Sequence, residues 1–198
     1  MRGPRGLLLV LADPPATLEE EFNDWYDTEH LPERAAIEGF ETARRYVACG
    51  GDGPRYAAIY DLAGLDVLEG GAYRAVSGEN FSPWTRRVVA SSRPQRMTAR
   101  KIDPAGGVTG PCARLLLVRA SGVDPTVADD LAAGLAASFA GSPAHIASRV
   151  FAGDEPAPDF VLGLSEFAGD RVPPLAVGAF GRVRAHLSLV ATYRPLAA

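Results

Sequence analysis

Two short apolar runs, Leu7-Leu8-Leu9-Val10 and Leu115-Leu116-Leu117-Val118, set the organisation of this sequence. Each run is bounded by turn-forming residues, a pattern that is typical of a buried strand. Between them, residues 103–111 are rich in Pro and Gly, which indicates a linker. The sequence therefore predicts a weak internal repeat: a first half over residues 1–102, a linker over 103–111 and a second half over 112–198.

The same order of elements is predicted in each half. In the first half the patterns predict strands at about 7–12, 41–49, 55–62 and 95–102, and helices from about 18 and over 65–76. Thr17 and Glu20 have the spacing of a capping box at the start of the first helix. A Gly- and Pro-rich turn at 50–54 predicts a hairpin, and another turn is expected near 83–89.

In the second half the patterns predict strands at about 113–120, 146–152, 160–167 and 184–193, helices at 126–140 and 175–180, and a turn at 153–158. The order is βαββαβ twice, which is the ferredoxin-like plan. Such a sheet carries helices on one face and leaves the other face bare. The predicted fold class is therefore α+β, with two tandem ferredoxin-like halves that bury their bare faces in one intramolecular α+β barrel.

Composition narrows the function. The chain has 198 residues, of which 47% are hydrophobic and 22% charged, as in ordinary folded proteins. A net charge of −4, with arginines spread along the chain, argues against nucleic acid as the main partner. No apolar run approaches the roughly 20 residues that span a bilayer, and the N-terminal run does not resemble a signal peptide. Cys49 and Cys112 lie far apart. We expect a cytoplasmic protein without a membrane partner.

Residues 21–34 carry most of the functional information. Phe22, Trp25, Tyr26 and Glu29 follow helical spacing, and His30 comes one position further round. Pro32 disfavours helical geometry in the residue before it, so the helix is predicted to weaken near Leu31. This would place His30 at the C-terminal end of a helix, where the helix dipole favours the imidazolium form.

This half resembles the dimeric α+β barrel superfamily, in particular its EthD-like branch. The resemblance covers about residues 5–102 and rests on Asp24-Trp25-Tyr26, Glu29-His30-Leu31-Pro32, Gly39-Phe40, Arg44-Arg45-Tyr46 and Tyr56 through Tyr60. Members include lactone isomerases, polyketide cyclases, dehydratases and cofactor-independent quinone-forming monooxygenases. The resemblance implies a small, often aromatic substrate held between sheet and helices, no cofactor, and His30 as the candidate acid or base.

The second half departs from this pattern. Its matching helix, at residues 129–139, consists mainly of small residues and has no Trp, Tyr or His. We expect this half to supply the packing partner that a second subunit supplies in dimeric relatives, and not a second active site. The expected assembly is a monomer with a pseudo-dimeric barrel, or a homodimer.

The candidate catalytic residues are His30 and Tyr26. A reference pKa of about 6.5 lets a histidine hold or release a proton near neutral pH; the alternative for His30 is a structural hydrogen bond. The candidate substrate-binding residues are Phe22, Trp25, Glu29, Tyr46, Tyr56, Tyr60 and Trp84. The aromatic residues among them would equally suit core packing with satisfied polar tips. Alternation along the strands is expected to place the strand tyrosines on one sheet face.

Other polar residues are expected to be structural. Arg44 and Arg45 lie on opposite faces of one strand, so only one can face a pocket and the other is expected to be a surface charge. His145 and His186 are placed in strands without metal-like spacing. The acidic residues around His30 need not share its helix face, so no metal is predicted.

The leading hypothesis is a small-molecule enzyme that performs cofactor-free acid/base chemistry on an aromatic or polyketide-like substrate. Isomerisation, cyclisation, dehydration and monooxygenation all remain open. The alternative is a non-catalytic protein that binds an apolar metabolite or a partner protein. A haem-binding barrel with a histidine ligand is a third, weaker option.

Overall fold

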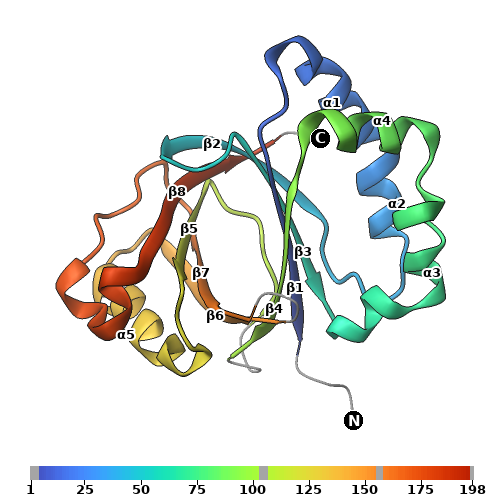
Figure 1. The fold of residues 1–198 in the computed structure, drawn as a ribbon. Helices are drawn as coiled ribbons and strands as arrows, with labels where there is room; N and C mark the ends of the chain where they lie inside the picture. The colour runs from blue at the N-terminus through green and yellow to red at the C-terminus, as the bar shows by residue number, and fades with distance from the viewer. Residues whose placement is uncertain (1–4, 103–106, 155–157, 197–198) are drawn as a thin grey trace.

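The computed structural model describes residues 5–102, 107–154 and 158–196. Its eight strands form a closed antiparallel barrel in the order β1-β3-β2-β8-β5-β7-β6-β4, with the helices on the outside (Figure 1). The strands are β1 (Gly6–Ala12), β2 (Arg44–Gly51), β3 (Tyr56–Leu62), β4 (Gln95–Lys101), β5 (Arg114–Ser121), β6 (His145–Gly153), β7 (Phe160–Phe167) and β8 (Leu187–Pro195). The predicted α+β barrel is confirmed.

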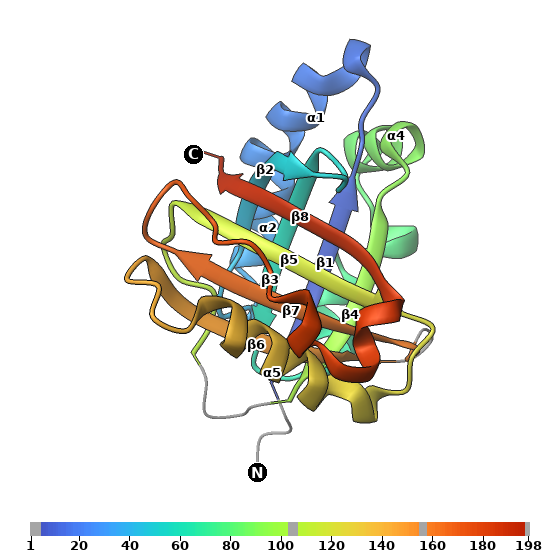
Figure 2. The same ribbon diagram turned by 90° about the vertical axis from the view of Figure 1, so that its left-hand side faces the viewer.

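Two groups of helices cover the barrel. The first group lies over β1 and β3 and consists of η1 (Ala16–Leu18), α1 (Glu19–Trp25), η2 (Tyr26–His30), α2 (Leu31–Ala35), η3 (Leu65–Glu69), α3 (Gly71–Arg74), η4 (Gly78–Asn80) and α4 (Pro83–Ser92). The second group lies on the outer side of β5 to β7 (Figure 2) and consists of η5 (Pro125–Val127), α5 (Ala128–Phe139), η6 (Val177–Ala179) and η7 (Gly181–His186).

The apolar runs form three separate cores. Leu7 and Leu9 of β1 point into the barrel, where they meet Leu115 and Leu117 of β5. Leu8 faces outward and packs beneath the first group of helices. Residues of β5 that face outward pack beneath α5 in the same way. Because both strands are buried on both faces, their sequences read as continuous apolar runs instead of alternating ones.

The predicted strands match the structure within a few residues, but two elements differ. The segment expected as a turn near 83–89 is helix α4, whose start is capped by the Ser82 hydroxyl accepting a 3.0 Å hydrogen bond from Thr85 N. Pro83 fits this first turn because its missing N–H needs no partner there. The last strand begins only at Leu187, so His186 lies in η7 and not in a strand. The predicted hairpin of β2 and β3 is confirmed.

The helix that carries His30 differs from the prediction at both ends. Thr17 makes no capping hydrogen bond, because Pro15 leads directly into the turn η1. Pro32 does not end the helix: α1 continues through the π-helical turn η2 into α2. The Leu31 N–H donates to the carbonyl of Tyr26, five residues back, and Pro32 takes a position in the first turn of α2. Proline lacks the N–H that an uninterrupted α-helix would use, and the π turn before it allows the helix to continue without that hydrogen bond.

The predicted linker lies partly outside the described residues, which resume at 107. Its described part is held by buried polar contacts from both sides of the barrel. Thr109 N donates to Asp61 (2.9 Å), and Gly110 N donates to Glu166 (2.7 Å). The turn expected at 153–158 also lies partly outside the described residues. None of the helices in the described part of the chain combines the length and apolar character needed to cross a membrane.

Candidate functional site

A cavity of about 270 Å³ lies between the first group of helices and the outer face of β1 and β3. Most of its lining is apolar or aromatic, as expected of a small-molecule site. Its lining residues are Leu8, Val10, Phe22, Trp25, Tyr26, His30, Arg34, Tyr60, Tyr73, Phe81, Val89, Ser92, Pro94 and Arg96. Five of the predicted site residues are therefore brought together: Phe22, Trp25, Tyr26, His30 and Tyr60.

The helix α1–η2–α2 supplies a row of four lining residues at intervals of four positions, Phe22, Tyr26, His30 and Arg34, and Trp25 lies beside this row. In an α-helix four residues exceed one turn, so each step would drift about 40° around the axis. A π turn holds more residues per turn and reduces this drift. The π turn thereby keeps His30 and Arg34 on the face that points toward the barrel.

His30 stacks on the ring of Trp25, with centroids 4.3 Å apart and planes inclined by 28°. Its Nδ1 is buried and has no hydrogen-bond partner. The pKa of His30 is lowered from 6.5 to about 3, chiefly by burial and further by the positive charges of Arg34 and Arg45. The predicted imidazolium is therefore wrong: the helix does not end at His30, so no helix terminus favours the charged form, and the imidazole is neutral at physiological pH.

Glu29 does not line the cavity, although it was a candidate for substrate binding. Its carboxylate accepts hydrogen bonds from Ser82 (2.6 Å) and Thr85 (2.8 Å) at the start of α4. The Thr85 hydroxyl in turn accepts a 2.9 Å bond from Trp25 Nε1. Glu29 thus helps to fix the indole ring on which His30 stacks.

Two tyrosines line the cavity beside His30. Burial raises the pKa of Tyr26 to about 12, and it raises the pKa of Tyr60 well above its usual value. Both phenols are therefore neutral and able to donate a hydrogen bond. The Tyr26 and Tyr60 hydroxyls influence each other's pKa, yet Tyr60 Oη has no partner in hydrogen-bonding geometry. The two hydroxyls are therefore neighbours without a well-formed hydrogen bond.

The other aromatic candidates lie elsewhere. Tyr46 faces the barrel interior, because it pairs with Ala57 of β3 and shares its face, so the expectation of one common tyrosine face is wrong. The Tyr56 hydroxyl is engaged by Asn23 Nδ2 (3.2 Å) and by the carboxylate of Glu19, outside the cavity. Trp84 donates from Nε1 to Glu21 (3.1 Å), which joins α4 to α1.

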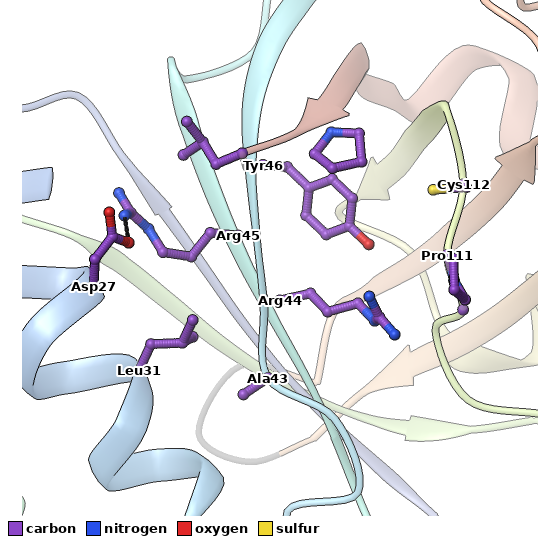
Figure 3. Close-up of a pocket in the computed structure, with 11 residues that line it drawn as sticks. Asp27, Leu31, Ala43, Arg44, Arg45, Tyr46, Pro111 and Cys112 are labelled. Carbon is purple, nitrogen blue, oxygen red and sulfur yellow. Dashed lines mark hydrogen bonds and ion pairs between the residues drawn. The ribbon is translucent and has the colours of Figure 1, made fainter. Parts of the chain in front are cut away.

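Neither arginine of the pair in β2 is a simple surface charge. Arg44 and Arg45 point to opposite sides of the strand (Figure 3). Arg45 is buried under the helix layer, where it forms an ion pair with Asp27 and lies 4.3 Å from the centre of the Tyr26 ring. Arg44 donates to the carbonyl of Thr109 (3.0 Å) on the other side. The expectation that one of the two arginines is a surface charge is therefore wrong, because the helix layer covers the face of β2 that Arg45 occupies.

A second cavity, also of about 270 Å³, lies beside the start of β2, the end of β8 and residues 110–112 (Figure 3). Tyr46, Cys112 and Leu196 are among its lining residues. Burial raises the pKa of the Cys112 thiol, so this cysteine is not activated as a nucleophile. His30 is not among the residues that line this cavity.

No group of three or more metal-ligating side chains occurs among the described residues. His145 is bonded to the Ser148 hydroxyl at 2.9 Å, which agrees with a structural role. A haem ligated by His30 does not fit the cavity as it stands. The volume of this cavity, about 270 Å³, is below the roughly 300 Å³ at which pockets for drug-sized ligands begin. A haem is at least as large as a drug-sized ligand.

Sequence reasoning missed Arg34, which is 2% exposed and lines the cavity. Its position four residues after His30, on the same helix face, is a signal that could have identified it. Tyr73, Phe81 and Arg96 were also missed. They come from segments far along the chain, and only the tertiary fold brings them to the cavity.

Comparison with known proteins supports the fold. No protein-family model matches the chain, and no curated protein matches it in sequence. Several solved structures match it over nearly their whole length. An anthrone oxidase-like protein is 17% identical with a TM-score of 0.66, and the match covers 98% of this chain and 92% of that one.

Two further matches are a chlorite dismutase variant and a candidate monooxygenase. The dismutase, from Candidatus Nitrospira defluvii, is 9% identical with a TM-score of 0.58, over 96% of this chain and 91% of that one. The candidate monooxygenase, from Lactobacillus acidophilus NCFM, is 8% identical with a TM-score of 0.57, over 98% and 94%. At these identities the likeness shows the fold alone, which is a closed α+β barrel.

Proposed function

We propose that this chain is a small-molecule enzyme that performs cofactor-free acid/base chemistry in the cavity around His30. The observation that carries the proposal is a set of three buried polar atoms without hydrogen-bond partners: His30 Nδ1, Arg34 Nη1 and Tyr60 Oη. All three residues line the same cavity. Buried polar groups are normally paired, so three unpaired ones around one cavity indicate that a ligand completes their bonds.

The chemistry follows from the protonation states. His30 is neutral, so one ring nitrogen has a free lone pair that can accept a proton from the substrate. Tyr60 and Tyr26 are neutral donors that can hold the oxygen on which negative charge develops. The ring of Trp25 offers a flat surface on which an aromatic substrate would be oriented.

The low pKa of His30 makes it a weak base in the empty cavity. A negative charge that develops on the substrate would oppose the effect of Arg34 and Arg45 and raise the pKa of the imidazole. Proton transfer to His30 is then favoured only when a substrate is present. A cyclic ketone with an acidic C–H, or the phenol or enol form of such a ketone with its acidic O–H, is the kind of substrate that meets this requirement.

The test uses anthrone, because one structural relative is described as anthrone oxidase-like. The reaction consumes one anthrone and one O₂ and yields anthraquinone and water, so it needs no further reductant. We expect oxygen uptake with the unaltered protein and its loss in His30→Ala and His30→Gln. Full activity in either variant would remove His30 from the proposal. Uptake no faster than in buffer would exclude oxidation of this substrate.

The second candidate function is a non-catalytic protein that binds an apolar metabolite. The observation in its favour is the pKa of about 3 at His30, since a base that weak is unusual for catalysis near neutral pH. This candidate predicts that anthraquinone-like molecules bind and protect the protein against unfolding, with no turnover of anthrone at any pH.

We further propose that the chain is a tandem ferredoxin-like repeat of the EthD-like branch, with halves at 1–102 and 112–198. The strand orders β4-β1-β3-β2 and β8-β5-β7-β6 support this, because the two sets follow the same relative order. One chain then closes the barrel that two subunits close in dimeric relatives. Sedimentation of the purified protein would distinguish the monomer from a further homodimer.

A further inference from the structure

Resting on the proposed function of the cavity, we infer that its ligand is bound as an oxyanion and that the Arg34 guanidinium supplies the counter-charge. The chemical class is an ionised phenol or enol on an aromatic or polyketide-like ring. Arg34 is thus assigned as the residue that selects the charged form of the ligand.

The first support is the unusual state of Arg34. The residue is 2% exposed, and its one side-chain hydrogen bond within the described part of the chain is from Nη2 to the carbonyl of Val76 at 2.7 Å. Its guanidinium carbon lies 5.1 Å from the centre of the Tyr73 ring, and its Nη1 is buried without a partner. A guanidinium presents five N–H donors, so most of its donor capacity is unused.

The second support is the absence of a compensating carboxylate. Within the described residues, no Asp or Glu lies at ion-pair distance from Arg34, whereas Arg45 of β2 is paired with Asp27. Glu33 interacts with Arg34 only through its electric field. Glu29 is committed to Ser82 and Thr85. A buried charge without a partner is costly in a folded protein, so an anionic ligand would relieve the cost.

The third support is the charge of the lining itself. The charged residues that line the cavity are Arg34 and Arg96, both positive, and no carboxylate is among the lining residues. Arg34 is buried, whereas Arg96 of β4 is exposed. A positive, apolar cavity with Tyr60 Oη as a second free donor favours one negatively charged oxygen attached to an aromatic ring.

The oxyanion is formed by loss of one proton from the ligand hydroxyl, and this proton passes to solvent on binding. No oxidant or second substrate is needed for this step. Binding should therefore release protons and should be tighter where the ligand ionises readily.

The experiment compares three probes of similar shape: 4-nitrophenol, its neutral methyl ether 4-nitroanisole, and 4-nitrobenzoate. At a pH about one unit below the pKa of 4-nitrophenol, we expect the protein to generate the yellow phenolate band as it binds the probe. Arg34→Met should weaken this binding roughly ten- to hundredfold, the range for a lost hydrogen bond to a charged group. Arg34→Lys should restore part of it. Arg74→Met, which removes an exposed arginine of α3 outside the lining, should weaken it less than threefold.

Each outcome has a distinct meaning. Preferred binding of 4-nitrobenzoate with the same dependence on Arg34 would support the oxyanion and identify a carboxylate as its source. Equal binding of 4-nitroanisole, unaffected by Arg34→Met, would overturn the inference while leaving the cavity as a binding site. Failure of all three probes would overturn this inference and count against the proposed function as well. Circular dichroism of each variant checks that the barrel remains folded.

Discussion

The imidazole of His30 stacks on the indole of Trp25 with ring centroids 4.3 Å apart. Trp25 is itself fixed, because its Nε1 donates to the Thr85 hydroxyl at 2.9 Å. The orientation of the candidate base therefore depends on a polar chain that begins at Glu29 and runs through α4. This relationship connects a residue of the cavity to a contact between two helices, and it can be tested through stability.

Trp25→Phe keeps an aromatic ring beneath His30 but removes the bond to Thr85. We expect it to lower the free energy of unfolding by about 1 kcal/mol from the lost hydrogen bond, measured by urea denaturation. The matched control is Trp84→Phe, whose indole bonds to the partly exposed Glu21. Its loss should be smaller. An equal or larger loss of stability in the control would show that the Trp25–Thr85 hydrogen bond contributes no more to stability than the Trp84–Glu21 bond does.

The stability of the protein should depend on pH through His30. Because the pKa of His30 falls from 6.5, the value of a freely solvated imidazole, to about 3 in the folded protein, the unfolded chain binds more protons between these values. The free energy of unfolding therefore falls as the pH decreases through this range, by up to a few kcal/mol. His30→Gln should flatten the profile between about pH 6.5 and 5, above most carboxylate titration. Parallel profiles for the two proteins would contradict the lowered pKa.

Much of the fold could be predicted because the apolar runs are unambiguous. Leu7–Val10 and Leu115–Val118 are buried on both faces, and the hairpin of β2 and β3 follows from its Gly- and Pro-rich turn. Helix α4 was missed, since Ser82 and Pro83 read equally well as a turn and as a capped helix start. The π turn was missed because Pro32 suggests a helix end, and only packing against the barrel keeps the chain helical there.

The site was predicted in part. The aromatic residues near His30 were found because helical spacing alone places them on one face. The sheet face of each strand tyrosine could not be predicted. The face of Tyr46 depends on its pairing with Ala57, and the register of a strand pair cannot be read from one strand. The low pKa of His30 results chiefly from its burial and further from the charges of Arg34 and Arg45, and the burial results from the helix layer. Local sequence carries no signal for that layer.

The pair Arg149–Glu166 ties the described part of the linker to the barrel. The two side chains are only 3% and 2% exposed, and Glu166 also accepts from Gly110 N. Glu166→Gln should cost about 3–5 kcal/mol of stability, because it leaves a buried guanidinium uncompensated. The double variant Arg149→Met/Glu166→Leu should lose less stability than the sum of the losses in Arg149→Met alone and Glu166→Leu alone. Additive losses in urea denaturation would show that the pair is not coupled.

Gly134 tests the packing of α5 against the turns that follow β7. A Cβ at this position would lie 2.5 Å from the ring of Phe180, whereas one at Gly178 would meet nothing within 4 Å. Alanine usually stabilises a helix interior by about 1 kcal/mol relative to glycine. Gly134→Ala should nevertheless destabilise the protein by about 1–3 kcal/mol through overpacking. Gly178→Ala should be near neutral. Thermal unfolding of both variants decides between these expectations.

Removing the hydroxyl of Tyr60 tests whether this group serves ligand binding or the stability of the fold. Tyr60 Oη is buried without a partner, whereas the Tyr193 hydroxyl donates to the carbonyl of Pro54 at 3.0 Å. Tyr193→Phe should cost about 1 kcal/mol because a bond is lost. Tyr60→Phe should be neutral or stabilising, since it removes an unsatisfied group, and it should weaken the binding of 4-nitrophenol. If Tyr60→Phe destabilised the protein as much as Tyr193→Phe does, the hydroxyl would have a structural partner, and its role in the cavity would have to be abandoned.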